Sequence, residues 1–387
     1  MILLFILFFL PLLLFLHSYI FYPLSIWTIS KFNDKKYSND DNYLPEISIL
    51  ISAYNEERVI ENTIRTLMNC FYPKERLQII IGSDNSEDRT AEILEKLSEE
   101  FSNIKVFIFN WRRGKPHVLN DLVKAAKGEI LVFCDANTLY EKEALMNLVK
   151  NYRDARVGGV SGKLKLKDVE KSKKAGSQEK KYWDAETWIK KQEGKLGILI
   201  GANGGIYSIR KEYFEEIPTN LPVMDDFYIS LKVLEKRKSF LYINDAVAEE
   251  ETAPTIKAEF NRKIRNNSIM MSSIKPLRLL LSPKFGLIAY AFWSHKIIRW
   301  FTPILLLSIF FSNVVLLNAN FFFNVSFLIQ LIFYLSAVIG YFLKKLNIQI
   351  TPLLMSFYFL MTNVALFIGL MKFLFGRQTA FWQSTPR

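Results

Sequence analysis

Both ends of the chain are apolar and nearly free of charge, and this feature most limits the folds open to the sequence. Residues 1–16 carry only apolar side chains, and no Lys or Arg occurs before Lys31. The stretch from Trp300 to Leu343 contains no charged residue. About 20 apolar residues suffice for a helix to cross the hydrocarbon core of a bilayer. We therefore predict an integral membrane protein with a transmembrane anchor at residues 1–30.

The C-terminal apolar region, residues 299–375, is too long for a single span. Trp300–Leu343 fits two spans with a turn near Asn318, and Ile350–Phe375 forms a third apolar run. If all three runs cross the bilayer, the tail at residues 376–387 lies opposite the central domain. If the third run is re-entrant or interfacial, the tail lies on the same side as that domain. The sequence leaves both arrangements open.

The charge distribution predicts that the middle of the chain lies in the cytosol. The 387 residues carry a formal net charge of +12, and Lys and Arg collect between the apolar ends. Such an excess on one side of membrane spans is typical of cytoplasmic loops. We therefore expect a multi-pass protein of the cell (plasma) membrane, whose basic residues face the lipid bilayer and an anionic substrate rather than nucleic acid. The two cysteines indicate no disulfide framework, which suits a reducing compartment.

Strand-like and helix-like stretches alternate in the central part of the chain, which indicates an α/β domain with a mostly parallel sheet. The expected strands are Ile47–Ala53, Leu77–Gly82, Lys105–Phe109 and the apolar run that ends at Asp135. Three of these strands end in polar clusters, which contain Asn55 and Glu56, Asp84, and Asp135. A parallel sheet brings these ends to one edge, which is where ligands of α/β proteins bind.

These strand ends favour a nucleotide site. Asp135 is a natural ligand for a hard divalent cation, Asp84 can accept hydrogen bonds from a base or ribose, and Lys115 can pair with a diphosphate. For any one of these residues, ordinary turn chemistry is the alternative interpretation. The sequence has neither the Walker motif G-x-x-x-x-G-K-[ST] nor G-x-G-x-x-G, so an ATPase or a dinucleotide enzyme is disfavoured.

Six segments in fixed order resemble an inverting family 2 glycosyltransferase. They are ISAYNEE, GSDNSEDRT, RRGKPHVLN, FCDANT, GANGGIYSIRK and MDDFYISLK. The resemblance runs from about Ile47 to Arg387 and is strongest to the membrane-integrated cellulose-synthase-like group, which includes hyaluronan and chitin synthases. It implies a GT-A nucleotide-sugar-binding domain at residues 31–255, inserted between transmembrane helices, with a UDP-sugar as the expected donor.

The resemblance also implies roles for individual residues. Those expected to bind the nucleotide sugar are Ala53, Tyr54, Asn55, Glu56, Asp84, Lys115, Asp135, Ala136 and Arg265. Asp135 takes the place of the first acid of the family's D-x-D motif and is expected to help bind Mg²⁺ or Mn²⁺. The second acid is replaced by Asn137, which is expected to be a weaker, neutral metal ligand or a group behind the ligands.

Asp225 and Asp226 stand where the family has an acidic pair, and Asp226 is the expected general base. An acceptor hydroxyl must lose its proton as it attacks the anomeric carbon, and a positioned base typically contributes about 10²–10⁴-fold to such a rate. Asp225 can raise the pKa of the pair through like-charge coupling. The alternative, which is compatible with catalysis, is that both acids cap the helix Phe227–Lys236.

Two further segments are expected to border the acceptor. Asn203, Gly204 and Gly205 would shape its pocket; the alternative is a tight turn before the strand Ile206–Ile209. Trp183 lies in the charged, helix-compatible segment Lys163–Lys195 and can pack on a sugar ring. A charged helix of this kind is more often a solvated face, and this alternative stays open.

The basic segment at residues 256–298 is expected to lie on the membrane surface. Lys257–Lys284 carries seven basic residues and one acid, with apolar positions that suit an amphipathic helix. In the family this place holds a Q-x-x-R-W motif, and Arg265 takes the place of its Arg near the diphosphate. Arg262 replaces the Gln and Asn266 the Trp, which weakens the case for a long processive polymer. The segment from Trp382 resembles the family's gating segment, which would place the tail in the cytosol.

Three functions follow from these features. The first is transfer of a sugar to a glycan acceptor in surface or exopolysaccharide synthesis, and the sequence leaves open whether this transfer is processive. The second is a single addition onto a polyprenyl-phosphate or lipid-linked acceptor. The third is a non-catalytic scaffold subunit of a polysaccharide export complex, against which the retained acids Asp84, Asp135 and Asp226 argue.

Overall fold

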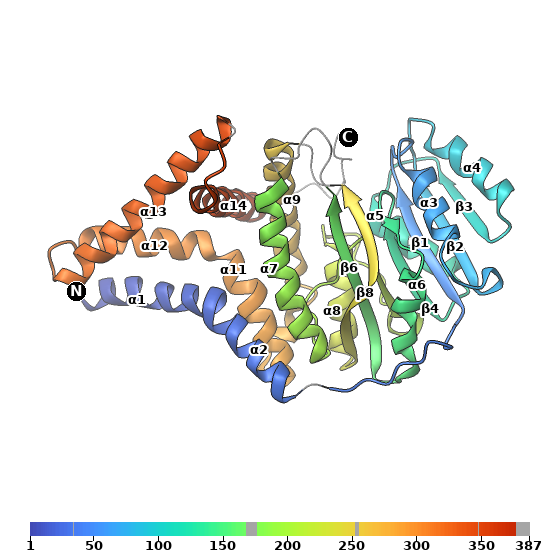
Figure 1. Cartoon of the computed structure of the whole chain (residues 1–387), viewed down its shortest axis with the longest axis horizontal. Coiled ribbons are helices and arrows are strands. Elements are labelled where there is room, and N and C mark those ends of the chain that lie inside the picture. Colours follow the sequence, from blue (N-terminus) through green and yellow to red (C-terminus); the bar gives the residue numbers. More distant parts are fainter. Residues whose placement is uncertain (34, 168–175, 252–254, 347, 377–387) are drawn as a thin grey trace.

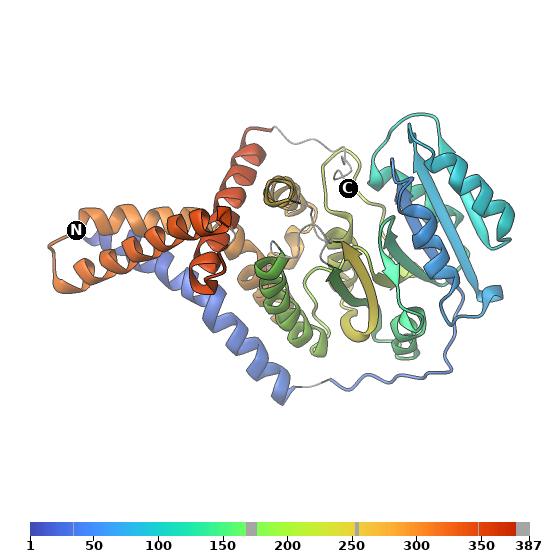
Figure 2. The ribbon, with the colours of Figure 1, turned by 45° about the horizontal axis from the view of Figure 1, so that its top comes forward.

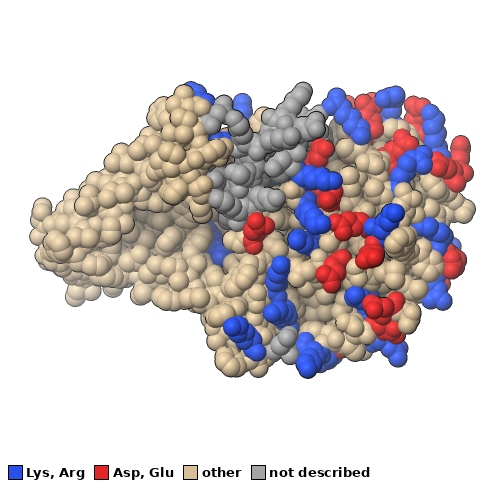
Figure 3. Space-filling view, in the orientation of Figure 1, with Lys and Arg blue, Asp and Glu red and all other residues tan. Residues whose placement is uncertain are grey.

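The computed structural model describes residues 1–33, 35–167, 176–251, 255–346 and 348–376. A mixed α/β domain lies on one side of the molecule and a group of apolar helices on the other (Figure 1). The visible surface of the apolar helices is almost free of Lys, Arg, Asp and Glu, whereas both signs of charge are interspersed over the domain (Figure 3). This division matches the expected arrangement of an α/β domain flanked by apolar helices.

The domain is built on one eight-stranded sheet with the order β3-β2-β1-β4-β7-β6-β8-β5. Its strands are β1 (Ile47–Ala53), β2 (Leu77–Asp84), β3 (Ile104–Phe109), β4 (Ile130–Asp135), β5 (Leu139–Tyr140), β6 (Val157–Lys167), β7 (Tyr207–Arg210) and β8 (Ser239–Glu251). Strands β1 to β4 pair in parallel, as do β6 and β8, while β7 runs antiparallel to β4 and β6 and β5 runs antiparallel to β8. The predicted α/β class with a mostly parallel sheet is confirmed.

Helices cover both faces of this sheet (Figures 1 and 2). They are α3 (Ile60–Met68), α4 (Thr90–Glu100), α5 (Lys115–Ala125), α6 (Ala144–Val149), α7 (Gly176–Lys195) and α8 (Asp225–Glu235). Successive side chains of a strand point to opposite faces. Leu50 of β1 accordingly packs in one buried cluster with Leu131 and Phe133, and its neighbours Ile49 and Ile51 pack in the other. Burial on both faces explains the unbroken apolar sequence of these strands.

The N-terminal anchor is one long helical segment. Helix α1 (Ile2–Leu16) and helix α2 (Tyr22–Phe32) are joined by a π-helical turn, His17–Phe21, and the segment Ile2–Phe32 is long and apolar enough to cross a membrane. This helical segment ends at Phe32, two residues beyond residue 30, and its role as an anchor stays a prediction.

The C-terminal region contains α9 (Ile256–Ser273), α10 (Leu287–Ala291), α11 (Ile298–Trp300), α12 (Thr302–Val315), α13 (Phe321–Lys345) and α14 (Thr351–Leu374). Among the described residues, α13 and α14 are candidate spans, whereas α12 meets the preceding helical segment, Leu287–Trp300, at a bend of 61°. The predicted turn lies between α12 and α13, where Asn318 adopts a φ of 66°.

Helix α14 runs crosswise to the other apolar helices. Figure 1 shows α14 almost end-on while α1 and α12 lie across the picture, and Figure 2 shows the same crossing from another side. Helix α14 packs on α9, where the Asn267 side-chain amide donates a hydrogen bond of 2.7 Å to the Leu366 carbonyl. A Cβ on Gly369 would lie 2.8 Å from the Ile264 carbonyl oxygen, so the two helix backbones approach closely. The tail from Trp382, expected to act in gating, lies outside the described residues.

Candidate active site

The polar strand ends meet at one edge of the sheet, as predicted. Ala53, the last residue of β1, pairs with Ser83 of β2, and Ser52 pairs with Asp135 at the end of β4. Asp84 ends β2 next to Ser83. This parallel register places the carboxylates of Asp84 and Asp135 on either side of β1, at the edge where α/β proteins bind ligands.

The loop after β1 is held by contacts with neighbouring loops. The Arg112 guanidinium lies 3.6 Å from the centre of the Tyr54 ring, a cation–π geometry. Asn55 adopts a φ of 54°, and its side-chain oxygen accepts a hydrogen bond of 2.8 Å from the Glu87 backbone. Glu56 is buried. Direct contact of Tyr54, Asn55 and Glu56 with a nucleotide stays a prediction.

Asp84 fixes the segment that delivers Lys115. Its two carboxylate oxygens accept hydrogen bonds from the backbone N–H groups of Arg113 and Gly114, each at 2.8 Å. Gly114 has a φ of 90°, which side-chain-bearing residues rarely adopt, and Lys115 begins α5 directly after it. Asp84 therefore has a structural role in addition to the nucleotide contact predicted for it.

Lys115 links the ends of two elements that are distant in sequence. Its ammonium lies 2.7 Å from Asp135 Oδ1 and 2.9 Å from Asp225 Oδ2. Burial alone would lower the pKa of Lys115, but the two adjacent carboxylates raise it above its ordinary value. Lys115 is thus a permanent positive charge beside Asp135, in the position that suits a partner for a diphosphate.

Gly204 lies between the expected metal ligand and the expected base. A Cβ on this residue would lie 3.2 Å from Asp226 Oδ2 and 3.3 Å from Asp135 Oδ2. Burial, followed by repulsion from Asp225, raises the pKa of Asp226 to about 7. At neutral pH Asp226 can therefore both accept and release a proton, which is what a general base requires.

The acidic pair belongs to the first turn of α8 and does not cap it. The helix begins at Asp225 and its N-cap residue is Met224, so the capping alternative is wrong in position. Asp226 Oδ1 instead accepts a 2.7 Å hydrogen bond from the next backbone N–H, that of Phe227. Negative charge in the first turn of a helix is stabilised by the helix dipole.

The donor set at Asp135 fits a hard divalent cation. Mg²⁺ typically binds one or two protein carboxylates and completes its shell with water and substrate phosphates. Asp135 supplies such a carboxylate, whereas the Asn137 amide donates a 3.0 Å hydrogen bond to Glu250. Among the described residues no group of three or more His, Cys, Asp or Glu side chains could hold a metal. Asp135 would therefore hold the ion together with the substrate's phosphates, and the ion would offset negative charge on the diphosphate.

The predicted acceptor loop is built into the protein. The Asn203 side chain is only 4% exposed, accepts a 2.6 Å hydrogen bond from Lys190 and donates one of 2.7 Å to the Gly162 carbonyl. The Gly205 carbonyl accepts a hydrogen bond of 3.1 Å from Tyr140. Asn203 therefore positions Gly204, and contact of these three residues with an acceptor stays a prediction.

Helix α7 differs from the solvated-face alternative. Its residues Lys190, Gln192 and Glu193 are all buried, because they face the anchor and the helices after α9 rather than water. Trp183 is partly buried, and its indole N–H donates to the Leu164 carbonyl at 3.1 Å. Its role beside an acceptor stays a prediction.

Arg265 lies on α9, and Ala136 directly follows Asp135 at the end of β4. Burial, together with the nearby Arg262, lowers the pKa of Arg265 on α9. The C-terminal end of α9 meets the start of α8, where Ser273 accepts a 3.1 Å hydrogen bond from the Met224 backbone. The Ala136 carbonyl accepts a hydrogen bond of 2.9 Å from Thr63, which anchors the turn after Asp135. The diphosphate role of Arg265 stays a prediction.

Some polar residues of this region are not distinguished by their sequence. Arg112 is marked only by its place in the segment RRGKPHVLN, and Lys190 is one of many lysines in a charged helix. Glu186 and His295 lie within hydrogen-bond distance although 109 residues separate them, and no local pattern can reveal such a contact.

Comparison with known proteins identifies the domain. Residues 48–217 match the family described as Glycosyl transferase family 2. The structure of the mannosyltransferase PcManGT from Pyrobaculum calidifontis, in complex with GDP-Man and Mn²⁺, covers 95% of this chain and 99% of its own with a TM-score of 0.73 at 19% identity. The fold is GT-A. The chain contains a family 2 glycosyltransferase domain.

Two curated relatives have named activities. The beta-monoglucosyldiacylglycerol synthase of Trichormus variabilis is 29% identical over 171 residues, which cover 44% of this chain and 36% of the relative. The poly-beta-1,6-N-acetyl-D-glucosamine synthase of Staphylococcus aureus (strain COL) is 31% identical over 137 residues, which cover 35% of this chain and 32% of the relative. The chain thus matches about a third of the length of each.

Proposed function

We propose that this protein is an inverting glycosyltransferase that moves a sugar from a nucleotide sugar to an acceptor hydroxyl at the membrane surface. The observation that carries the proposal is the position of Gly204. A Cβ added to this residue would lie 3.2 Å from the Asp226 carboxylate and 3.3 Å from that of Asp135. A carboxylate suited to proton transfer and one suited to a metal–diphosphate group therefore face the same small space.

Each residue then has a task in one displacement. Lys115 supplies positive charge to the diphosphate as the bond between it and the anomeric carbon breaks. Asp226 accepts the proton of the acceptor hydroxyl, whose oxygen forms the new bond to the anomeric carbon from the opposite face. Asp225 holds Lys115 from the side of α8. A bound Mg²⁺ or Mn²⁺ would offset the charge of the leaving nucleotide diphosphate.

The base favours a hydroxyl acceptor over a phosphate acceptor. A hydroxyl group becomes a strong nucleophile only when a base removes its proton, whereas a phosphate monoester is already an anion at neutral pH. Asp226, with a pKa raised to about 7 by burial and by Asp225, is suited to the first task and unnecessary for the second. Among the lipid-linked acceptors, those with a free sugar or lipid hydroxyl therefore fit better than a bare polyprenyl phosphate.

A screen of UDP- and GDP-sugars tests this proposal. The purified full chain should release nucleotide from at least one of them, EDTA should abolish the release, and Mn²⁺ or Mg²⁺ should restore it. UDP-sugars are the first choice, and GDP-sugars are included because the similar PcManGT structure holds GDP-Man. The variant Asp226→Asn is the control for contaminating activity. A complete absence of turnover with every donor would favour the scaffold alternative instead.

The acceptor can be a growing glycan or a glycolipid. The names of the two relatives correspond to these two kinds of acceptor: one is a polysaccharide synthase and the other a glycosyldiacylglycerol synthase. Asn266 at the position of the family's acceptor-stacking Trp favours short products, because an amide lacks the flat apolar face on which a sugar ring packs. The length distribution of the products decides: a ladder of chain lengths indicates a polymerase, and one added sugar indicates a single-addition enzyme.

We further propose that the domain lies in the cytosol and that α14 lies along the membrane interface. Support comes from its crosswise direction and from its packing on the basic helix α9 (Figures 1 and 2). The tail would then lie on the side of the domain. A cysteine introduced by Ser384→Cys should react with a membrane-impermeant maleimide in inside-out vesicles and not in intact cells; the opposite result would place the tail outside.

A further inference from the structure

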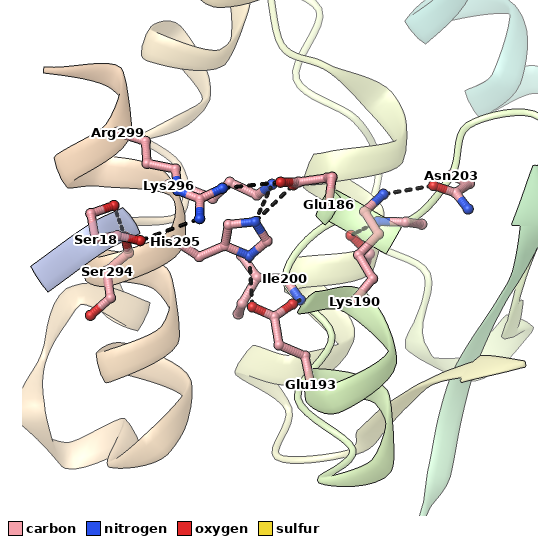
Figure 4. A network of polar contacts seen from close by, with 12 residues as sticks. Ser18, Glu186, Lys190, Glu193, Ile200, Asn203, Ser294, His295, Lys296 and Arg299 are labelled. Carbon is pink, nitrogen blue, oxygen red and sulfur yellow. Dashed lines mark hydrogen bonds and ion pairs between the residues drawn. The ribbon is translucent and has the colours of Figure 1, made fainter. Parts of the chain in front are cut away.

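A buried group of charges joins the domain to the membrane helices beside the acceptor loop (Figure 4). We call it the cationic cluster and define it as Lys190, His295, Lys296 and Arg299 with the carboxylates Glu186 and Glu193. Glu186 on α7 is its hub: one oxygen lies 2.7 Å from both His295 Nε2 and Lys296 Nζ, and the other accepts from Arg299 at 3.1 Å. Burial alone would raise the pKa of Glu186, but His295 and Lys296 lower it well below its ordinary value.

His295 lies between the two carboxylates of the cluster. Its Nε2 faces Glu186 and its Nδ1 lies 2.6 Å from Glu193. Glu193 also accepts hydrogen bonds from the Tyr22 hydroxyl at 2.5 Å and from the Ile200 backbone at 3.1 Å.

Lys190 adds a cation without a carboxylate of its own. Its side chain is 8% exposed, and its hydrogen-bond partner is the neutral oxygen of Asn203 at 2.6 Å. Within the described part of the chain no carboxylate lies in ion-pair distance of Lys190. All six side chains of the cluster are largely buried.

A buried ammonium such as that of Lys190, which has no carboxylate at ion-pair distance within the described residues, is costly unless an anion from outside balances it. Two features indicate where such an anion comes from. Lys190 contacts Asn203, whose neighbour Gly204 borders Asp226, so the cluster adjoins the proposed acceptor site. Arg299 donates to the Ser18 carbonyl of the membrane anchor, so the cluster also adjoins the bilayer.

We propose that the cationic cluster binds a phosphate group of a lipid-linked acceptor, whose reacting hydroxyl lies a few bonds away at Asp226. This inference rests on the proposed function. The phosphate takes no part in the bond changes: the sugar leaves its nucleotide diphosphate, the acceptor oxygen bonds to the anomeric carbon, and Asp226 takes the hydroxyl proton. Lys190 is a specificity-determining residue in this scheme, since it distinguishes a phosphorylated acceptor from a neutral one.

Binding of farnesyl phosphate to the full chain in a non-ionic detergent tests the inference. Saturating Mn²⁺ with UDP, and in a parallel series with GDP, keeps the nucleotide site filled, and the shift of the thermal unfolding temperature gives the affinity. Farnesyl phosphate should stabilise the wild type, whereas farnesol should not. Lys190→Met should weaken the binding at least tenfold. Lys195→Met is the matched control on the exposed side of the same helix and should bind like the wild type.

Further outcomes separate the alternatives. Lys190→Arg keeps the charge and should stay within about threefold of the wild type. If Lys190→Met unfolds without ligand, Lys296→Gln replaces it as the weakened variant. Equal stabilisation by inorganic phosphate at the same concentration would overturn the lipid part of the inference, and wild-type affinity in Lys190→Met would overturn all of it. Farnesyl phosphate binding without any nucleotide-sugar turnover would instead contradict the proposed function and leave the phosphate site standing.

Discussion

Replacing Asp226 by asparagine should slow sugar transfer and at the same time stabilise the domain at neutral and alkaline pH. Burial, with repulsion from Asp225, raises the pKa of Asp226 from 3.8 to about 7. Each unit corresponds to about 1.4 kcal/mol, so ionised Asp226 lowers the free energy of unfolding by up to about 4 kcal/mol. This penalty is absent below pH 3.8, grows as the pH rises, and is complete above pH 7. Asparagine removes it, because its amide stays neutral.

Two measurements on the purified full chain check this prediction. The kcat of Asp226→Asn should fall by about 10²–10⁴-fold, the usual contribution of a general base. Thermal unfolding in EDTA, which keeps divalent cations away from the carboxylates, should show a higher midpoint for the variant at pH 8 and a smaller difference at pH 5. About 2–4 °C per kcal/mol is expected for a domain of this size.

Asp225→Asn is the matched control. Asp225 lies 2.9 Å from the Lys115 ammonium, so its loss removes a partner from a buried cation and should lower the midpoint at both pH values. The reasoning is refuted if Asp226→Asn unfolds at or below the wild-type temperature at pH 8. A kcat within tenfold of wild type would equally refute the assignment of Asp226 as the base.

Three further predictions concern single contacts. Gly204→Ala should reduce kcat at least tenfold with little loss of stability, because its Cβ would crowd the carboxylates 3.2–3.3 Å away; steady-state kinetics and unfolding together check this. Lys115→Met should bind Mn²⁺ more tightly without nucleotide, since no ammonium competes for Asp135, and should raise the donor KM at least tenfold. An unchanged Mn²⁺ affinity by calorimetry together with an unchanged donor KM would contradict this prediction. Glu186→Gln should cost about 3–5 kcal/mol of stability, seen as a lower unfolding midpoint, whereas the exposed Glu92→Gln should leave it unchanged.

The strands that the sequence revealed share one property. β1, β2 and β4 are buried on both faces and pair in parallel, so each appears as a short apolar run between polar loops. β6 and β8 were not predicted. They pair across more than 80 residues and contain register shifts. β6 ends in the alternating sequence KLKLK and β8 in three successive glutamates, so only the tertiary pairing makes them strands. The register in turn explains why Asp84 and Asp135 flank β1.

The site could be predicted to the extent that its residues follow strands or start helices. Asp135 follows β4 and Lys115 starts α5, and the fold brings them within 2.7 Å of each other. The sequence could not show that both carboxylate oxygens of Asp84 accept hydrogen bonds from a loop, because the donors are backbone N–H groups. The cationic cluster was missed for a similar reason: its partners come from helices that only the folded chain brings together.

The same cluster connects the predicted membrane anchor to the site. Tyr22 and Ser30 of α2 are fully buried, and they donate hydrogen bonds to Glu193 at 2.5 Å and to Gln192 at 2.9 Å. These two acceptors lie on α7, next to Lys190, which holds Asn203 and thereby Gly204. Asp84 and Asp135 are therefore positioned by the sheet, and the loop at Gly204 by helices fixed to the anchor. The proposed lipid-linked acceptor would suit this division, because the loop at Gly204 keeps its place relative to the bilayer.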